Sequence, residues 1–337
     1  MTTIYLIRHA EAEGNLYRVA HGQYNSTITP RGYRQLTALR RRFADVPIDA
    51  VYGSDLFRTQ TTASAIYKPR GLTFHPLPLL REVNLGIWEE MTWAEIERMD
   101  REMLVNFNKR PDLWRAEGAE TFDVVRDRMV EGIRQIAREC PGATVAATSH
   151  GAASRILLGT LNGLSLREIG ATHHCDNTAV SKLEVEGDQI RVVYEGDNSH
   201  MPPELSTFRR QSWHKSDLAT EPGLWFVTVR DDETGMALNA MLEEEQVGRI
   251  EFSLSDDALV LEDYRLTPER RGQRYGAQLM GQAVKYARRH GKDRVRLACG
   301  ADLAGYFLQF GFAETGRQGE DRVMELDLRL IMGEIPD

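Results

Sequence analysis

The sequence has little cysteine, no long apolar run and no surplus of positive charge, and each shortage argues against a class of protein. Its three cysteines, Cys140, Cys175 and Cys299, are an odd number at wide spacing, which does not suit a disulfide framework, a zinc knuckle or a redox pair. No run of about 18 apolar residues occurs and no secretory signal is visible, so we expect a cytoplasmic protein without a membrane span. Lys and Arg number 42 against 50 Asp and Glu, and the net charge of −8 argues against nucleic acid as the main partner.

What is present is ordinary globular composition in a chain of 337 residues, a length that predicts two domains or one large barrel at about 150 residues per domain. Up to Gly196, short apolar runs alternate with longer amphipathic stretches, the pattern of a mostly parallel sheet flanked by helices. Turn formers gather between Gly196 and Gly223. We therefore expect a first domain over 1–205, a linker over 206–223 and a second domain over 224–337.

The apolar periodicity also predicts individual elements in both parts of the chain. In the first domain we expect strands over 4–7, 48–52 and 144–148, helices over 30–46 and 59–67, a helical region over 91–138 and a hairpin over 180–193. In the second we expect strands over 224–229, 236–242, 247–252, 258–266, 294–298 and 323–328, with helices over 275–290 and 303–310.

Polar segments follow three of the strands expected in the first domain. Arg8 and His9 follow the first, the segment from Ser54 to Arg58 follows the second, and His150 follows the third. Ligands of open α/β sheets bind at the carboxyl ends of strands, so we expect these side chains in one crevice. For His9 alone, a capped loop histidine is the structural alternative. Two imidazoles and two guanidiniums without metal-ligating carboxylates suit a phosphate dianion.

In their order and spacing these residues resemble the histidine phosphatase (phosphoglycerate mutase-like) superfamily over about residues 2 to 200. The motifs that carry the resemblance are Arg8-His9 with Asn15, Gly22 with Ile28-Thr29, Ser54-Asp55 with Arg58-Thr59, Leu80-Arg81-Glu82, Gly118 with Glu120-Thr121, His150-Gly151 and Asn177-Thr178. The fold implied is α/β, with an N-terminal three-layer phosphoglycerate mutase-like domain. Ala10 stands where the family usually has Gly, and Asn25 and Thr27 stand where it often has Asp and Pro, which bears on substrate choice.

The resemblance implies a role for each residue of this site. His9 is expected to be the nucleophile that takes the phosphoryl group, and Glu82 the acid that protonates the leaving oxygen and then activates water. The expected phosphate and substrate contacts are Arg8, Arg58, His150, Asn15, Gly22 and the amide of Gly151. We expect a phosphomonoesterase that hydrolyses a small phosphorylated metabolite through a phosphohistidine, without metal or cofactor. For Glu82, the alternative is a surface ion pair with Arg81.

Two other interpretations of the first domain are weighed. The spacing Glu13-Gly14-Asn15 resembles mutases, whereas the segment from Leu80 to Glu89 looks like the broad phosphatase branch. We favour hydrolysis, with phosphoglycerate mutase-type phosphoryl transfer as the alternative. The run His173-His174-Cys175-Asp176 invites a metal site, but adjacent residues of an extended segment point to opposite sides, so we expect no metal there.

The second domain contains a strand, a basic turn with glycine and a helix start over 261–279. Exposed amides at such a helix start, with flanking arginines, can bind a pyrophosphate. Together with the segments 295–298 and 304–312, this pattern resembles the GNAT acetyltransferase family over 247–328, which implies an α+β fold and bound acetyl-CoA or CoA. The residues expected at the cofactor are Leu266, Arg271, Gly272, Gln273, Arg274, Tyr275, Gly276 and Ala277.

This domain departs from the family's pattern in ways that bear on its chemistry. Arg274 stands where the turn usually has a second Gly, Ala301 where an Asn often contacts the cofactor, and Phe307 where a Tyr commonly protonates the thiolate, while Tyr306 is expected to point elsewhere. The stretch before Glu262 is too short for the pair of helices that normally walls the acceptor site. Two hypotheses follow: a small N-acetyltransferase with Glu262 as base, which makes the protein bifunctional, or a non-catalytic module that binds CoA or supports homodimers.

Overall fold

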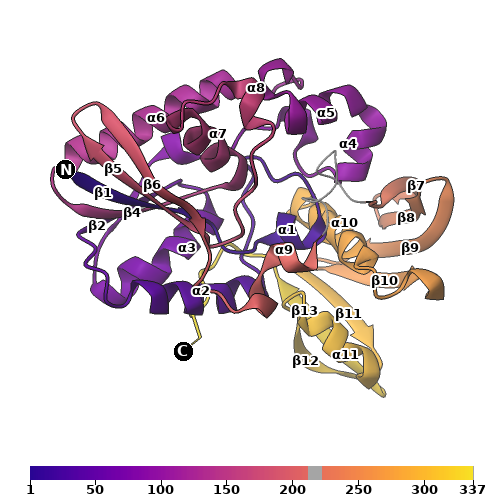
Figure 1. Ribbon diagram of the computed structural model, residues 1–337. Helices are drawn as coiled ribbons and strands as arrows, with labels where there is room; N and C mark the ends of the chain where they lie inside the picture. The colour runs from indigo at the N-terminus through magenta and orange to yellow at the C-terminus, as the bar shows by residue number, and fades with distance from the viewer. Residues whose placement is uncertain (212–221, 337) are drawn as a thin grey trace.

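Two β-sheets organise the chain in the computed structural model, which describes residues 1–211 and 222–336 (Figure 1). The first sheet has the order β3-β2-β4-β1-β5-β6, in which β1 to β4 run parallel and β5 and β6 run antiparallel. Its strands are β1 (Thr2–Arg8), β2 (Ala50–Gly53), β3 (Phe74–Pro76), β4 (Thr144–Ser149), β5 (Val180–Glu186) and β6 (Gln189–Asp197). The expected mostly parallel sheet is confirmed.

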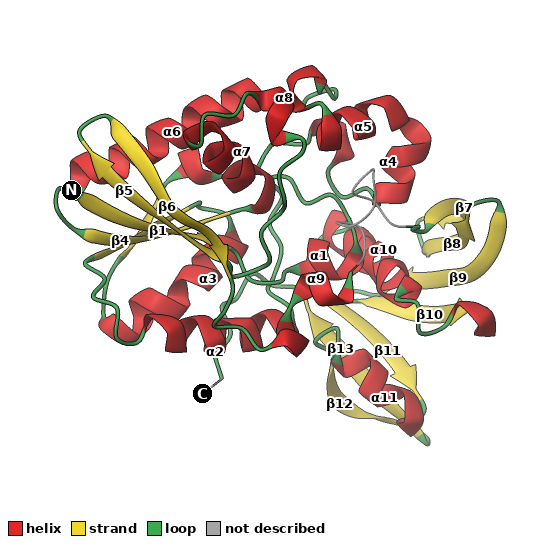
Figure 2. Ribbon diagram, viewed as in Figure 1, coloured by secondary structure: helices red, strands yellow, loops and turns green. Residues whose placement is uncertain are grey.

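Helices cover both faces of the first sheet and make three layers (Figure 2). Alternate residues of the strands divide between two cores: Ile4 and Val145 pack with α6 and α7, whereas Ile7 and Ala146 pack with α2 and α3. The helices are α1 (Glu13–Tyr17), α2 (Pro30–Phe43), α3 (Phe57–Tyr67), α4 (Trp93–Met99), α5 (Arg101–Lys109), α6 (Phe122–Glu139), α7 (Gly151–Leu161), α8 (Leu166–Ile169) and α9 (Thr207–Arg210). Thr29 caps α2, since its hydroxyl accepts from the Gly32 amide at 3.0 Å.

The second sheet has the order β12-β13-β11-β10-β9-β8-β7 and is antiparallel except for β10 beside β11. Its elements are β7 (Trp225–Asp232), β8 (Gly235–Leu242), β9 (Glu245–Leu254), β10 (Leu259–Leu266), α10 (Tyr275–Arg289), β11 (Arg294–Cys299), α11 (Ala301–Leu308), β12 (Ala313–Gln318) and β13 (Asp321–Asp327). Strands β10 and β11 pair only through 259–260 and 295–296 and then separate. Strands β7 to β10 follow one another without an intervening helix.

The elements expected from apolar periodicity are confirmed, but β3 and β12 are not predicted by it. Strand β3 has three residues, and all six residues of β12 are exposed, so neither carries the apolar alternation that marks a half-buried strand. No helix within 1–211 or 222–336 is long and apolar enough to cross a membrane.

The segment before the second domain and the last residues of that domain both contact helix α2 of the first domain. The expected linker over 206–223 falls partly outside the described residues, and its opening residues contact the first sheet's helices: the Gln35 amide donates to the Thr207 hydroxyl at 3.2 Å. At the C-terminal end, the Pro336 carbonyl accepts from Thr37 Oγ1 at 2.8 Å and from Arg40 Nη2 at 2.7 Å on α2.

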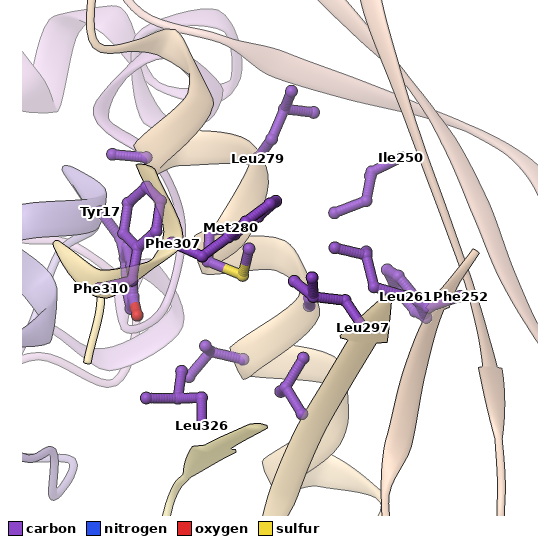
Figure 3. Packing of buried hydrophobic residues seen from close by; sticks show 14 of the residues in the cluster. Tyr17, Ile250, Phe252, Leu261, Leu279, Met280, Leu297, Phe307, Phe310 and Leu326 are labelled. Atoms are coloured by element: carbon purple, nitrogen blue, oxygen red, sulfur yellow. The ribbon is translucent and has the colours of Figure 1, made fainter. Parts of the chain in front are cut away.

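Residues in and directly after α1 join the hydrophobic core of the second domain at the contact with α10. Tyr17 of α1 is 3% exposed and lies beside Phe310, with ring centroids 6.4 Å apart (Figure 3). Gly281 of α10 permits this approach, because a Cβ there would lie 2.7 Å from the Cβ of Tyr17. Arg288 of α10 also pairs with the buried Glu13 at 2.7 Å. The two units are therefore packed against each other through apolar contacts and a shielded ion pair.

Replacing Gly281 with Val tests this contact. The added side chain has no space against Tyr17, so the free energy of unfolding should fall by about 1–3 kcal/mol, as for other overpacked cores. Urea unfolding measures the change. Gly305→Ala on α11 is the matched control, because nothing lies within 4 Å of its added Cβ and it should be neutral or stabilising. Equal stability of Gly281→Val and the wild type would contradict close packing here.

Candidate active site

Four of the expected residues line one cavity of about 120 Å³ at the strand ends of the first sheet. Arg8 ends β1 and His9 follows it, Arg58 lies in the first turn of α3, and Glu82 lies in the loop after β3. His150, which precedes α7, is fully buried and does not line the cavity: its ring centroid lies 5.3 Å from that of His9, and its Nε2 lies 2.9 Å from the Ser54 hydroxyl. The arrangement follows from the topology, because β2, β4 and β1 are neighbours and their carboxyl ends share one edge.

His9 is held as a neutral imidazole. Its Nδ1 lies 2.7 Å from the Ala10 carbonyl, which can only accept, so Nδ1 carries the proton and Nε2 keeps its lone pair. Burial, followed by the charges of Arg58 and Arg8, holds the pKa of His9 well below its usual range. The Asn177 side chain donates to the His9 carbonyl at 2.8 Å and fixes the backbone. This imidazole is therefore prepared to act as a nucleophile near neutral pH.

Two buried guanidiniums lie beside His9 with hydrogen-bonding capacity to spare. Arg58 is fully buried and donates to the carbonyls of Tyr24 at 2.9 Å and Gly22 at 2.7 Å, while its Nε has no partner. Arg8 donates to the Cys175 carbonyl, and its Nε is likewise buried without a partner. Burial lowers the pKa of Arg58 to about 10, which leaves it cationic at neutral pH. Unpaired buried donors cost about 1–3 kcal/mol each, so these groups are arranged for an anion.

The side chain of Glu82 reaches from the loop after β3 to the N-terminus of α7. Its carboxylate accepts from the amides of Ala153 at 2.8 Å and Ala152 at 3.2 Å. Arg81 instead pairs with Asp55, with Nε 2.6 Å from Oδ1. The alternative of a surface ion pair between Glu82 and Arg81 is therefore wrong. Glu82 faces the cavity as a carboxylate that backbone amides hold in place.

The three other residues expected at the phosphate also line the cavity, with different tasks. Asn15 accepts the Ala12 amide on Oδ1 at 3.1 Å, which leaves its amide nitrogen for a ligand. Gly22 has φ +49°, and a Cβ there would lie 2.0 Å from Glu89, so this glycine lets the loop present its carbonyl to Arg58. Gly151 opens α7, and its Cβ position lies 3.3 Å from Arg8.

Several lining residues were not expected from the sequence. His21 is half-buried, its Nε2 contacts the Ser26 hydroxyl at 2.5 Å, and the loss of solvent around its ring holds its pKa well below the usual range. Its position next to Gly22 is the one sequence signal that pointed to it. Phe208 of α9 lies in the segment expected to be a linker, and its ring centroid is 5.6 Å from the Arg8 guanidinium carbon. Trp93 and Phe107 add apolar wall.

Within the described ranges, no three His, Cys, Asp or Glu side chains come close enough together to hold a metal ion. Residues of the run from His173 to Asp176 instead contact arginines. His174 lines the cavity and contacts Arg155 at 3.3 Å, and the Cys175 carbonyl accepts from Arg8.

The second domain borders a larger cavity, of about 840 Å³, and all eight residues expected at the cofactor line it. Arg274 adopts a left-handed conformation with φ +66°, the backbone geometry for which the family uses Gly. It is followed directly by α10, whose N-terminus borders the cavity. This cavity can therefore take an anionic group at a helix start with arginines on either side.

Two expectations for this domain need correction. Tyr306 does not point elsewhere: it lines the large cavity, and its hydroxyl is 2.7 Å from that of Tyr264, which donates to the Gly276 carbonyl at 2.6 Å. Glu262 is not among the residues that line the cavity. It is exposed and accepts from Ser253 at 2.6 Å, because the bulge between 261 and 263 directs it to β9.

Comparisons with known proteins find a family match for each of the two parts of the chain. A family model of the histidine phosphatase superfamily (branch 1) matches residues 4–198, and one of the acetyltransferase (GNAT) family matches residues 199–312. The probable phosphoglycerate mutase GpmB of Cronobacter sakazakii is 35% identical over 167 residues, 49% of this chain and 76% of that protein. The structure of Bacillus stearothermophilus YhfR is 31% identical with a TM-score of 0.58, covering 59% of this chain and 99% of YhfR.

The α-ribazole phosphatase of Shigella flexneri shares the fold at 22% identity and a TM-score of 0.52, over 58% of this chain and 96% of that one. The extent of these matches and the arrangement at the strand ends lead to one assignment. The chain belongs to the histidine phosphatase superfamily and carries a GNAT acetyltransferase-family domain after its phosphatase domain.

Proposed function

We propose that the first domain is a phosphomonoesterase that works without a metal through a phosphohistidine. The observation that carries the proposal is the pair of buried, unpartnered guanidinium nitrogens of Arg8 and Arg58 beside the neutral His9. The guanidiniums supply the positive charge that stabilises a phosphoryl group during transfer. Relatives named as phosphatases support the same class of reaction.

The geometry suits a two-step hydrolysis. In the first step, Nε2 of His9 attacks phosphorus, a P–N bond forms, the bond to the leaving oxygen breaks, and Glu82 gives that oxygen a proton. In the second step, Glu82 takes a proton from water, the water oxygen attacks phosphorus, and the P–N bond breaks to release phosphate. The amides of Ala152 and Ala153 hold the Glu82 side chain in place for both proton transfers.

The cavity walls favour hydrolysis of a monoester over transfer between phosphoglycerates. Beyond the charged residues named above, Val19, Leu85, Trp93 and Phe107 line the cavity, and Arg18 is the one further Lys or Arg among its described lining residues. A leaving group with an apolar part packs against such walls, whereas each further anionic group of a bisphosphoglycerate needs a cationic partner of its own. We propose that the substrate is a small phosphorylated metabolite whose leaving group has an apolar part.

His9→Ala tests the nucleophile. Loss of the covalent intermediate should lower kcat on p-nitrophenyl phosphate about 10³-fold or more, measured with EDTA present so that no added metal contributes. His75→Ala, at an exposed position outside the cavity, should keep the wild-type rate. A His9→Ala rate close to the wild type would remove His9 from the role.

Glu82→Gln tests the proton transfer. Gln keeps the shape of Glu but carries no transferable acid proton, so hydrolysis of an alkyl phosphate should slow about 10²- to 10⁴-fold. The loss in the phosphorylation step should be smaller for p-nitrophenyl phosphate, whose leaving oxygen needs little protonation. Single-turnover rates on the two substrates measure the difference. An equal loss on both would indicate damage to the cavity rather than loss of an acid.

We propose that the second domain binds acetyl-CoA or CoA at the large cavity. The residues present fit such a ligand: the start of α10 suits a pyrophosphate, and Arg271 and Arg274 add positive charge. When bound, acetyl-CoA supplies an acetyl group for transfer. Tyr306 lines this cavity and brings a phenolic hydroxyl to it. The family resemblance expects such a hydroxyl one position later, where this chain has Phe307. Because Glu262 lies outside the cavity, we propose that binding is the better supported of the domain's two activities.

Gly276→Glu tests CoA binding. The substitution places a negative charge at the turn, so isothermal titration should show binding of CoA to the wild type and none to the variant. Gly276→Ala is the matched control, since it brings the same Cβ, 2.0 Å from the Tyr306 hydroxyl, without the charge, and should weaken binding only in part. Absence of binding to the wild type at millimolar CoA would refute the proposal.

A further inference from the structure

The large cavity is bounded by both domains. Besides the turn before α10 and residues of α11, it is lined by Glu11 and Leu16, by Arg18 after α1, by Arg31 of α2 and by Arg210 of α9. Figure 1 shows α1 and α9 beside α10, in agreement with the contacts between α1 and α10. The phosphatase domain thus forms one wall of the cavity proposed for CoA.

The cavity is strongly cationic in a protein whose net charge is −8. Six arginines line it: Arg18 and Arg31 come from the first domain, Arg210 from the segment after it, and Arg265, Arg271 and Arg274 from the second domain. Glu11 is the one carboxylate among its lining residues in the described chain. So much positive charge on both sides of one space favours a ligand with several anionic groups.

Glu11 and Arg31 form only a long ion pair. The Glu11 Oε1 is 3.8 Å from Nε of Arg31 and accepts from the Thr29 hydroxyl at 2.8 Å. Burial raises the pKa of Glu11, while its hydrogen bonds and the charge of Arg210 act in the opposite direction. The long pair with Glu11 leaves a nitrogen of the Arg31 guanidinium for a ligand.

Arg31 lies in the first turn of α2 with its side chain 12% exposed. Its Nη1 is buried and has no hydrogen-bond partner. Burying an unpaired donor of a charged group is unfavourable in the absence of a ligand. This is the kind of donor that an anionic oxygen in the cavity would satisfy.

We propose that Arg31 of the phosphatase domain and Arg210 of the segment that follows this domain bind phosphate groups of CoA, so that both parts of the chain form the cofactor site together. The inference rests on the proposed CoA binding of the second domain. CoA carries a pyrophosphate and a 3′-phosphate, more negative charge than one helix start and its flanking arginines neutralise. The cavity volume of about 840 Å³ is also large enough for such a cofactor, within the range of about 300–1,000 Å³ for ligand pockets.

The test is isothermal titration of CoA into the full chain and its arginine variants. Arg31→Ala and Arg210→Ala should each weaken binding about 10- to 100-fold, the effect of losing a hydrogen bond between charged groups. Arg34→Ala on the same helix and Arg209→Ala beside Arg210 are matched controls, because both are exposed and neither lines the cavity. These controls should bind CoA like the wild type.

Dephospho-CoA, which lacks the 3′-phosphate, locates the contact. A loss of affinity seen with CoA alone assigns the arginine to the 3′-phosphate, and a loss seen with both ligands assigns it to the pyrophosphate. The rate on p-nitrophenyl phosphate checks that each variant is folded. If Arg31→Ala does not fold, the CoA affinity of Arg210→Ala, a substitution at an exposed position, tests the proposal.

Wild-type affinity in both Arg31→Ala and Arg210→Ala, with binding still lost in Gly276→Glu, would overturn the shared site and leave the second domain as the sole CoA binder. Failure of the wild type to bind CoA would instead refute the proposed function itself. The two failures are therefore distinguishable in one series of titrations.

Discussion

Burial of two guanidiniums beside an imidazole shapes the phosphatase domain. A charge moved into the protein interior costs several kcal/mol unless polar partners surround it. Arg58 obtains such partners from the carbonyls of Gly22 and Tyr24, and Arg8 from that of Cys175, so loops distant in sequence are drawn to the strand ends. Burial and the same charges hold the pKa of His9 well below its usual range. The groups proposed to bind phosphate therefore also prepare the proposed nucleophile.

This arrangement leaves little freedom in the surrounding backbone. Gly22 needs its left-handed conformation to present its carbonyl, and any side chain there would collide with Glu89. Glu82 is held by the start of α7, whose amides carry the positive end of the helix dipole. The side chains proposed as acid and nucleophile are therefore positioned by backbone elements that surround them.

The second domain is joined to the first by more than chain continuity. Tyr17 enters its core, Arg288 pairs with Glu13, and the residues up to Pro336 return to α2. Arg18 and Gln211 line both cavities. In the described residues from 222 to β10, strands β7 to β9 follow one another without a pair of helices. The phosphatase domain supplies apolar and cationic side chains beside this sheet.

The sequence by itself determined the chemistry at the strand ends and at the turn before α10. Both are local patterns, in which a strand, a few polar residues and a helix start follow one another within a dozen or so positions, so Arg8, His9, His150 and the turn from Arg271 could be found without a structure. Short or fully exposed strands such as β3 and β12 carry no such pattern and could not.

Tertiary structure alone decided the contacts between residues far apart in the chain. Nothing near Glu82 in the sequence shows that Ala153, rather than Arg81, is its partner. Nothing near Arg31 shows that it borders a cavity of the second domain, and helix register alone did not place the hydroxyl of Tyr306 at the turn. These contacts depend on how sheets and helices pack in three dimensions, where separations along the chain have no fixed relation to distance in space.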